Sequence, residues 1–267
     1  MFMFKKKKES HSSACGGCSS CGGFLSQMGV DLSKWDFCVA LAGNPNTGKS
    51  TVFNALTGLR QHTGNWPGKT VTRAEGAFRY EDKRYKLIDL PGTYSLLSTS
   101  TDEEIARDFI LFGQPDCTVI VVDATCLERN LNLVLQVLEI TDKAVVCLNL
   151  MDEAKRKGIE VDHRMLARDL GVPVIPVTAK TGEGLNLLLK AVHDIVTHEI
   201  KTTPYRIKLD PEIDQIVKDL SPMIKKTFPN VPNPDWIALR LLDNDSRIQD
   251  ALFQDEFSNL QPQRRDS

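Results

Sequence analysis

Short apolar runs alternate with segments of helical spacing between residues 37 and 200. The apolar runs predict buried strands at 37–42, 85–89, 119–123, 144–149 and 174–178. Apolar residues recur at helical spacing in segments 51–57, 101–113, 131–140 and 185–200. Strands and helices in alternation are typical of an α/β fold, and we expect a mixed, mainly parallel sheet.

A Gly- and Pro-rich segment interrupts this alternation. Residues 61–71 are predicted to form a mobile loop, which leads into a polar hairpin with strands 71–80 and 83–90. Trp66 looks exposed in this loop. The alternative interpretation, equally favoured, is that Trp66 packs inward and anchors the loop.

After Pro204 the pattern predicts helices only. Residues 211–228 have helical spacing, although Pro222 is expected to limit or kink that helix. Further helices are expected from Asp235 and from Ser246, which would be the N-cap of the last one. We therefore expect three parts, namely a flexible tail over 1–34, an α/β domain over 35–200 and a small all-helical domain over 201–267.

Composition narrows the class of protein only a little. The 267 residues include 33 Lys and Arg against 35 Asp and Glu, a net charge of -2, which gives no global case for binding nucleic acid or an anionic membrane. No apolar stretch approaches the roughly 20 residues that span a bilayer, so no membrane crossing is expected in this chain.

Four of the seven cysteines lie in or beside apolar runs. Cys38, Cys117, Cys126 and Cys147 are expected to be small buried apolar residues, as free cysteines usually are. This usage favours a reducing, intracellular compartment.

The other three cysteines form a C-x2-C-x2-C run in the Gly- and Ser-rich tail. Cys15, Cys18 and Cys21 could hold Zn2+ or an iron–sulfur cluster, with His11 as a fourth ligand. A ferredoxin run would place a cysteine where Leu25 stands. We favour incidental thiols in a flexible tail and keep metal binding as the alternative.

The strongest chemical signal follows the first strand. Residues 43–50 read Gly-Asn-Pro-Asn-Thr-Gly-Lys-Ser, which matches G-x-x-x-x-G-K-[ST] between a strand and a helix. The glycines allow backbone N–H groups to surround phosphates, and the helix N-terminus adds positive charge. Lys49 is expected to bridge the β- and γ-phosphates, and the Ser50 hydroxyl to bind Mg2+.

Later motifs indicate that the nucleotide is GTP. Residues 89–92 form D-x-P-G, whose Asp89 would hold Mg2+ through water and whose Gly92 N–H would contact the γ-phosphate. Residues 149–152 form N-x-x-D, whose carboxylate can accept from guanine N1–H and its 2-amino group. A helix cap is the alternative for that motif. Thr70 would complete Mg2+ coordination when the γ-phosphate is present.

Together these motifs resemble the cytosolic G domain of FeoB ferrous iron transporters. The likeness covers about residues 36–255, and its most specific element is Gly-Asn-Trp-Pro-Gly-Lys-Thr-Val over 64–71. The resemblance implies a Ras-like P-loop GTPase domain, a helical domain that slows nucleotide release, and a polytopic Fe2+-conducting membrane part of the same polypeptide. This chain would be the portion on the cytoplasmic side of a bacterial inner membrane, with its oligomeric state left open.

The resemblance also implies a K+ activator, held by the Asn46 side chain and by the carbonyls of Gly64 and Trp66. A cation beside the β–γ bridge would neutralise charge that develops in the transition state. Thr93 stands where Ras-like enzymes carry the glutamine that orients water, so hydrolysis is expected to be slow without such help. Leu150 replaces the lysine that many GTPases carry over the purine.

The motifs and the resemblance together define the expected site. The residues expected to bind GTP are Gly43, Asn44, Pro45, Asn46, Thr47, Gly48, Lys49, Ser50, Thr51, Gly68, Lys69, Thr70, Val71, Thr72, Asp89, Leu90, Pro91, Gly92, Asn149, Leu150, Met151, Asp152, Thr178, Ala179 and Lys180. Those expected to act in catalysis are Asn46, Lys49, Thr70 and Gly92.

Two rival functions stay open from sequence. A ribosome- or RNA-associated assembly GTPase is disfavoured because residues 201–267 carry ten Lys and Arg against eleven Asp and Glu and contain no Gly. A switch that binds GTP without significant turnover is the other rival. Measured kcat would separate it from an enzyme.

Overall fold

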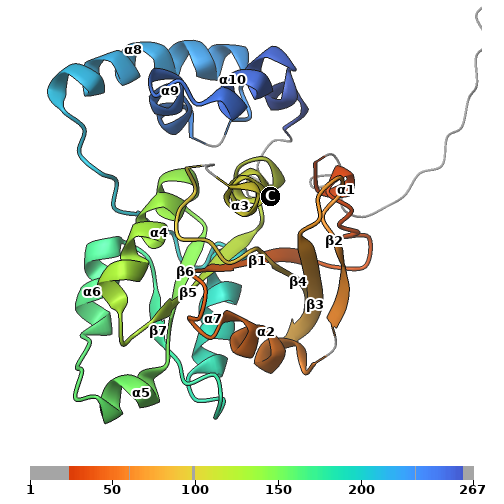
Figure 1. Ribbon diagram of the computed structural model, residues 1–267, viewed down its shortest axis with the longest axis vertical. Coiled ribbons are helices and arrows are strands. Elements are labelled where there is room, and N and C mark those ends of the chain that lie inside the picture. The colour runs from red at the N-terminus through yellow and green to blue at the C-terminus, as the bar shows by residue number, and fades with distance from the viewer. Residues whose placement is uncertain (1–23, 60, 98–99, 232, 261–267) are drawn as a thin grey trace, which may run out of the picture.

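Residues 24–59, 61–97, 100–231 and 233–260 are described by a computed structural model (Figure 1). They form one seven-stranded sheet in the order β2-β3-β4-β1-β5-β6-β7. The strands are β1 (Phe37–Gly43), β2 (Gln61–Asn65), β3 (Thr72–Tyr80), β4 (Lys83–Asp89), β5 (Cys117–Asp123), β6 (Ala144–Asn149) and β7 (Val174–Pro176).

The sheet is mixed and mainly parallel, as the alternating pattern predicts. β1 pairs in parallel with both β4 and β5, and β6 pairs in parallel with β5 and β7. β3 is antiparallel to both β2 and β4, so the polar hairpin forms one side of the sheet. The chain therefore has the α/β class expected from its sequence, and the carboxyl ends of the parallel strands meet at one edge.

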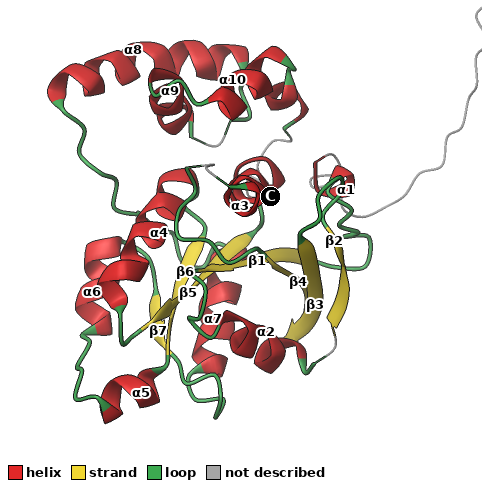
Figure 2. Ribbon diagram, viewed as in Figure 1, coloured by secondary structure: helices red, strands yellow, loops and turns green. Residues whose placement is uncertain are grey.

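Helices cover both faces of this sheet and continue into a helical C-terminal part (Figure 2). Their bounds are α1 (Phe24–Gln27), α2 (Lys49–Thr57), α3 (Thr101–Gly113), α4 (Leu127–Ile140), α5 (Met151–Arg156), α6 (His163–Leu170), α7 (Leu185–Val196), α8 (Pro211–Thr227), α9 (Pro234–Leu242), α10 (Ser246–Phe253) and the short 3-10 helix η1 (Glu256–Asn259).

Two apolar cores follow from the period-2 alternation of the strands. Ala40 of β1 belongs to the core that contains Phe109 of α3 and Leu133 of α4. Its neighbour Leu41 points the other way and packs in the core of Phe53 from α2, on the opposite face. The loops at the ends of β1, β4 and β6 are thus held by an interior of fully buried side chains.

Four sequence expectations differ from the structure. Residues 61–65 form strand β2 on the edge of the sheet rather than a loop, because their backbone pairs with β3. α8 continues through Pro222, so this proline does not end the helix. Asp245, not Ser246, caps α10, because its carboxylate accepts from the Ile248 N–H. Cys126 is exposed, because it stands just before α4 rather than inside a strand.

Cys38, Cys117 and Cys147 are buried, as expected. Burial raises the pKa of Cys147 to about 12, which keeps it a protonated, inert thiol. The tail cysteines Cys15, Cys18 and Cys21 lie outside the described residues.

The C-terminal helices pack above α3 and α4 (Figure 1). The Phe112 ring of α3 lies 5.2 Å from the Phe257 ring of η1. The Asn233 side chain donates to the backbone carbonyl of Glu139 in α4. Within the part of the chain that the structure describes, no helix is long and apolar enough to cross a bilayer.

Candidate nucleotide-binding site

The loop between β1 and α2 makes a tight turn that depends on close backbone approaches. Asn46 and Gly48 both have left-handed backbones, with φ of 67° and 78°. A Cβ on Gly48 would lie 2.4 Å from the Asn149 side-chain nitrogen, and one on Gly43 would lie 2.6 Å from the Val121 carbonyl oxygen. These two positions therefore require glycine, and the loop is fixed against β5 and β6.

Lys49 begins α2 and is engaged with the end of β4. Its ammonium forms an ion pair with the Asp89 carboxylate and donates to the Leu90 carbonyl over 2.7 Å. Burial raises the pKa of Asp89, and the Lys49 charge opposes that shift. The structure thus places a cation and an acid, both expected at the phosphates, within direct contact of each other.

Asn149 joins three of the expected motifs at the end of β6. Its amide donates to the Thr47 carbonyl over 3.0 Å and accepts from the Ala179 N–H over 3.1 Å. The side chain is 1% exposed. The helix-cap interpretation is wrong for Asn149. The N-cap position of α5 is held by Leu150, which has a left-handed backbone, and no side chain caps the helix.

The segment after β2 is anchored by Trp66. Its side chain is 1% exposed and its ring lies 5.6 Å from the Phe109 ring of α3, edge to face. The guanidinium of Arg73 lies 5.5 Å from its centre. The packing-anchor interpretation is confirmed and the exposed one is wrong, because β2 and the following turn direct the ring into the core. Thr70 is exposed on that turn.

The segment after β4 runs along the phosphate-binding loop. Leu90 N–H donates to the Leu41 carbonyl over 3.0 Å, and Thr93 N–H donates to the Gly43 carbonyl over 3.3 Å. A Cβ on Gly92 would lie 3.5 Å from the backbone nitrogen of Pro45. Glycine keeps this backbone close to the loop.

The oxygen donors expected for Mg2+ are gathered in part. Ser50 is exposed in the first turn of α2, and Asp89 contacts the neighbouring Lys49. Hydroxyls and a carboxylate are the hard ligands that Mg2+ prefers, so these residues fit the ion. Thr70 stands on the separate turn that Trp66 anchors.

The groups expected for K+ have other contacts in this conformation. Asn46 is exposed. Gly64 pairs with Arg73 in the β2–β3 ladder, and the Trp66 carbonyl accepts from Lys69 N–H over 3.0 Å. Among the described residues no hydrogen bond connects Asn46 to Gly64 or Trp66.

Most of the remaining expected residues are exposed or half-buried. Gly68 is left-handed with φ of 69°, and the Lys69 ammonium lies 3.4 Å from Glu104 on α3. Asp152 is half-buried in the first turn of α5. Exposed positions are Thr51, Thr72 and Lys180; half-buried ones are Pro45, Val71, Pro91, Leu150 and Met151; Thr178 and Ala179 are buried.

Sequence reasoning missed the polar contacts between α3 and the helical part. Arg107 is fully buried and its guanidinium lies 2.8 Å from Asp245, while Asp108 pairs with Arg247 over 2.8 Å. An adjacent Arg and Asp among the apolar residues of segment 101–113 was the available signal.

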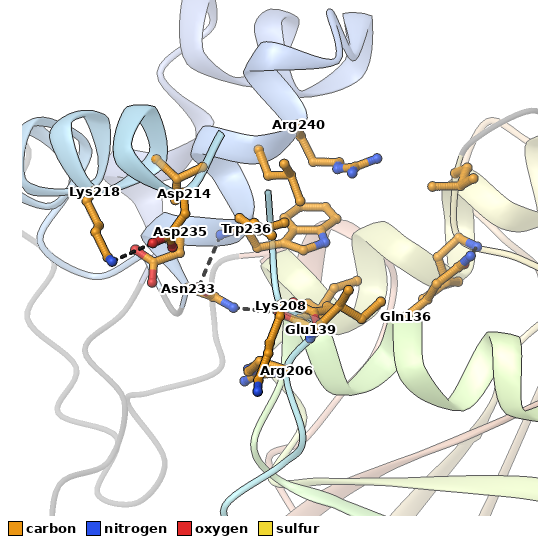
Figure 3. A pocket seen from close by; sticks show the side chains of 17 residues that line it. Gln136, Glu139, Arg206, Lys208, Asp214, Lys218, Asn233, Asp235, Trp236 and Arg240 are labelled. Atoms are coloured by element: carbon orange, nitrogen blue, oxygen red, sulfur yellow. Dashed lines mark hydrogen bonds and ion pairs between the residues drawn. The ribbon is translucent and has the colours of Figure 1, made fainter. Parts of the chain in front are cut away.

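A cavity of about 700 Å³ lies between the same two parts of the chain (Figure 3). Leu96 and Leu97, which follow the D-x-P-G motif, line it together with Glu139 of α4, Trp236 of α9 and Arg206 of the connecting segment. Gln136 accepts from the Leu96 N–H over 2.6 Å. Residues downstream of Gly92 therefore touch the boundary between the α/β part and the helical part.

Known proteins match this chain in both parts. Residues 37–192 match the family model for ferrous iron transport protein B, and residues 210–266 match that for the FeoB cytosolic helical domain. The Fe(2+) transporter FeoB of Escherichia coli K12 is 41% identical over 212 residues, which cover 78% of this chain. This chain spans 27% of the length of that relative.

Solved structures of FeoB cytosolic domains are similar to this chain in fold and sequence. The cytosolic domain of L. pneumophila FeoB superimposes with a TM-score of 0.74 at 35% identity, covering 85% of this chain and 90% of that one. The cytosolic domain of T. maritima FeoB in a GDP form gives a TM-score of 0.74 at 35% identity, over 86% and 88% of the two chains. Its GMPPNP form gives 0.72. With the fold, the motifs and both family models in agreement, the chain belongs to the FeoB family of ferrous iron transport proteins.

Proposed function

We propose that this chain binds and hydrolyses GTP and regulates a ferrous iron transporter. The observation that carries the proposal is the position of Asn149, whose two hydrogen bonds join the phosphate-binding loop to the segment expected at guanine. Relatives solved in GDP and GMPPNP forms support it. Calorimetric titration with both nucleotides and a phosphate-release assay test it; absence of GDP and GMPPNP binding would refute it.

We assign the site residues the following roles. The loop N–H groups and Lys49 hold the phosphates, and Lys49 exchanges Asp89 for the β- and γ-phosphates when the nucleotide enters. Ser50, Thr70 and Asp89 would hold magnesium, which neutralises phosphate charge when bound. Gly92 N–H contacts the γ-phosphate. Thr93 is 5% exposed and lacks an amide, so hydrolysis is slow without another helper.

Asp152 should decide the choice of base. Asp152→Asn removes the carboxylate that accepts from guanine N1–H and the 2-amino group, and we expect GTP affinity to fall about 100-fold. Xanthosine triphosphate, which has a carbonyl in place of the 2-amino group, should gain affinity because an amide can donate to it. Competition against a fluorescent GDP analogue measures both.

The neighbouring Glu153→Gln is the matched control for that change. Glu153 pairs with Arg156 at the surface of α5, 3.4 Å apart, and the variant should bind GTP as the wild type does. Unchanged GTP affinity in Asp152→Asn would contradict the guanine assignment.

Potassium should stimulate hydrolysis through Asn46. In KCl we expect GTP turnover to be about tenfold faster than in NaCl at equal ionic strength, because a cation at the β–γ bridge stabilises developing charge. Asn46→Ala should abolish the difference and leave the NaCl rate unchanged. Equal wild-type rates in the two salts would refute the potassium site.

We also propose the division into a G domain over 35–200 and a helical domain over 201–267, with the tail over 1–34 before them. The helical domain packs on α3, which follows the D-x-P-G segment, and this contact supports the proposal that it slows nucleotide release. The partner would be a membrane permease part of the same polypeptide, with this portion on the cytoplasmic side of a bacterial inner membrane.

A further inference from the structure

Asn44, the second residue of the phosphate-binding loop, has a buried side chain without a hydrogen-bond partner. It is 2% exposed, and both its amide nitrogen and its amide oxygen lack a partner among the described residues. Its backbone carbonyl is engaged, since the Thr47 hydroxyl donates to it over 2.9 Å. Leaving a buried amide unsatisfied is costly, and native proteins rarely do so.

The other two buried asparagines of the described chain show what is usual here. Asn130 accepts from the Asp123 N–H over 3.2 Å and donates to the Cys126 carbonyl over 2.9 Å. Asn149 makes the two hydrogen bonds that join Thr47 and Ala179. Asn44 therefore differs from asparagines of equal burial in the same fold. We infer that its amide is hydrogen-bonded in another conformation of the protein.

Asn44 lies between two residues that approach the segment after Asp89: Gly43 accepts from Thr93 N–H, and a Cβ on Gly92 would lie 3.5 Å from the Pro45 nitrogen. Ala40 and Ala42 of β1 face the core shared with Leu90, Leu96 and Phe109. This is the face on which the segment after Asp89 lies. The same segment is held to the loop by the 3.3 Å hydrogen bond from Thr93 N–H to the Gly43 carbonyl, adjacent to Asn44.

We expect this segment to shift when Gly92 N–H contacts a γ-phosphate, as the switch segments of GTPases do. Thr93 follows Gly92, so its long hydrogen bond to Gly43 is the contact most easily exchanged. We propose that Asn44 is a positioning residue whose amide hydrogen-bonds the backbone of residues 92–94 only when a γ-phosphate is bound, and so holds Gly92 in place for hydrolysis. The inference rests on the proposed GTPase function and extends it to a specific state.

Asn44→Leu tests this, because leucine has the same number and branching of side-chain heavy atoms and lacks the amide. Nucleotide-free protein should melt at the wild-type temperature or above it, since an unsatisfied buried amide is replaced by an apolar group. GDP affinity should fall several-fold less than GMPPNP affinity, because the amide acts only when a γ-phosphate is bound. Affinity for GMPPNP and the single-turnover rate of GTP hydrolysis should each fall about tenfold, the effect of losing one buried hydrogen bond.

Thr118→Val is the matched control. Thr118 is fully buried in β5, and its hydroxyl also lacks a partner in the described structure, but it lies near the start of the strand, away from the loop. Its removal should leave hydrolysis and both nucleotide affinities unchanged. This control separates relief of an unsatisfied group from an effect on the γ-phosphate state.

Each contrary outcome has a distinct meaning. If Asn44→Leu melts several degrees lower without nucleotide and weakens GDP and GMPPNP equally, the amide shapes the loop or binds a water, and the inference is overturned. Wild-type GMPPNP affinity and turnover in the variant would overturn it as well. Wild-type protein that binds neither nucleotide would instead refute the proposed function on which it rests.

Discussion

Lys49→Ala should lower the rate of GTP hydrolysis by about 1,000-fold, the largest catalytic effect expected in this protein. The ammonium that bridges the β- and γ-phosphates is lost, and no other lysine stands in the loop 43–50 to replace it. The variant also leaves the Asp89 carboxylate without its ion-pair partner. Because burial already raises the pKa of Asp89, losing Lys49 should raise it further and weaken the Mg2+ site.

Single-turnover phosphate release with saturating GTP measures the chemical step, and titration with GDP measures binding separately. Lys190→Ala is the control, since Lys190 makes a surface pair with Asp194 over 2.7 Å on α7. That variant should hydrolyse GTP at the wild-type rate. A Lys49→Ala rate within tenfold of wild type would show that Lys49 is not the phosphate-bridging group.

Arg107→Met should cost about 3–5 kcal/mol of unfolding free energy, the largest stability effect expected. The Arg107 side chain is fully buried and pairs with Asp245 over 2.8 Å and with Asp108 over 3.5 Å. Methionine fills much of the same volume but leaves the buried Asp108 and the half-buried Asp245 without the Arg107 charge. Urea unfolding followed by circular dichroism gives the free energy.

A second change should restore part of that loss. Asp245→Asn removes one charge and keeps an N-cap for α10, because asparagine caps helices as well as aspartate does. The double variant should therefore be more stable than Arg107→Met. If the two effects simply add, the pair is not coupled. Lys218→Ala, which removes an exposed pair with Asp214 on α8, should change stability by less than about 1 kcal/mol.

The stability of Arg107→Met should also depend on pH. Burial raises the pKa of Asp108 in the folded state, so protonation of this carboxyl favours folding. Without Arg107 that shift should increase. The stability deficit of Arg107→Met should therefore shrink as the pH is lowered from 7 to 5. A deficit independent of pH would assign the loss to packing.

Nucleotide exchange should also report on this interface if the helical part slows release. The chain from Gly92 to α3 passes Leu96 and Leu97, which line the cavity beside Trp236 (Figure 3). Loosening α3 at Arg107 would free that segment. Faster GDP release in Arg107→Met than in Lys218→Ala would support the proposed role of the helical domain.

Local sequence determined the α/β class, the mainly parallel sheet and the position of the phosphate-binding loop. Each of these depends on contiguous residues: apolar runs form the strands, and Gly43 and Gly48 permit the turn between β1 and α2. The expectation of a loop at 61–65 was wrong because this strand depends on residues that are not its neighbours in sequence. These residues are polar and carry little strand signal, and only pairing with β3 makes them a strand.

Tertiary structure decided how distant side chains meet. Asn149 reaches Thr47 across 102 positions, and Arg107 reaches Asp245 across 138. It also decided that Trp66 is buried and that the Asn44 amide lacks a partner among the described residues. Periodicity and motif spacing report only neighbours along the chain, whereas hydrogen bonding and burial depend on which remote residues the fold brings within a few ångströms.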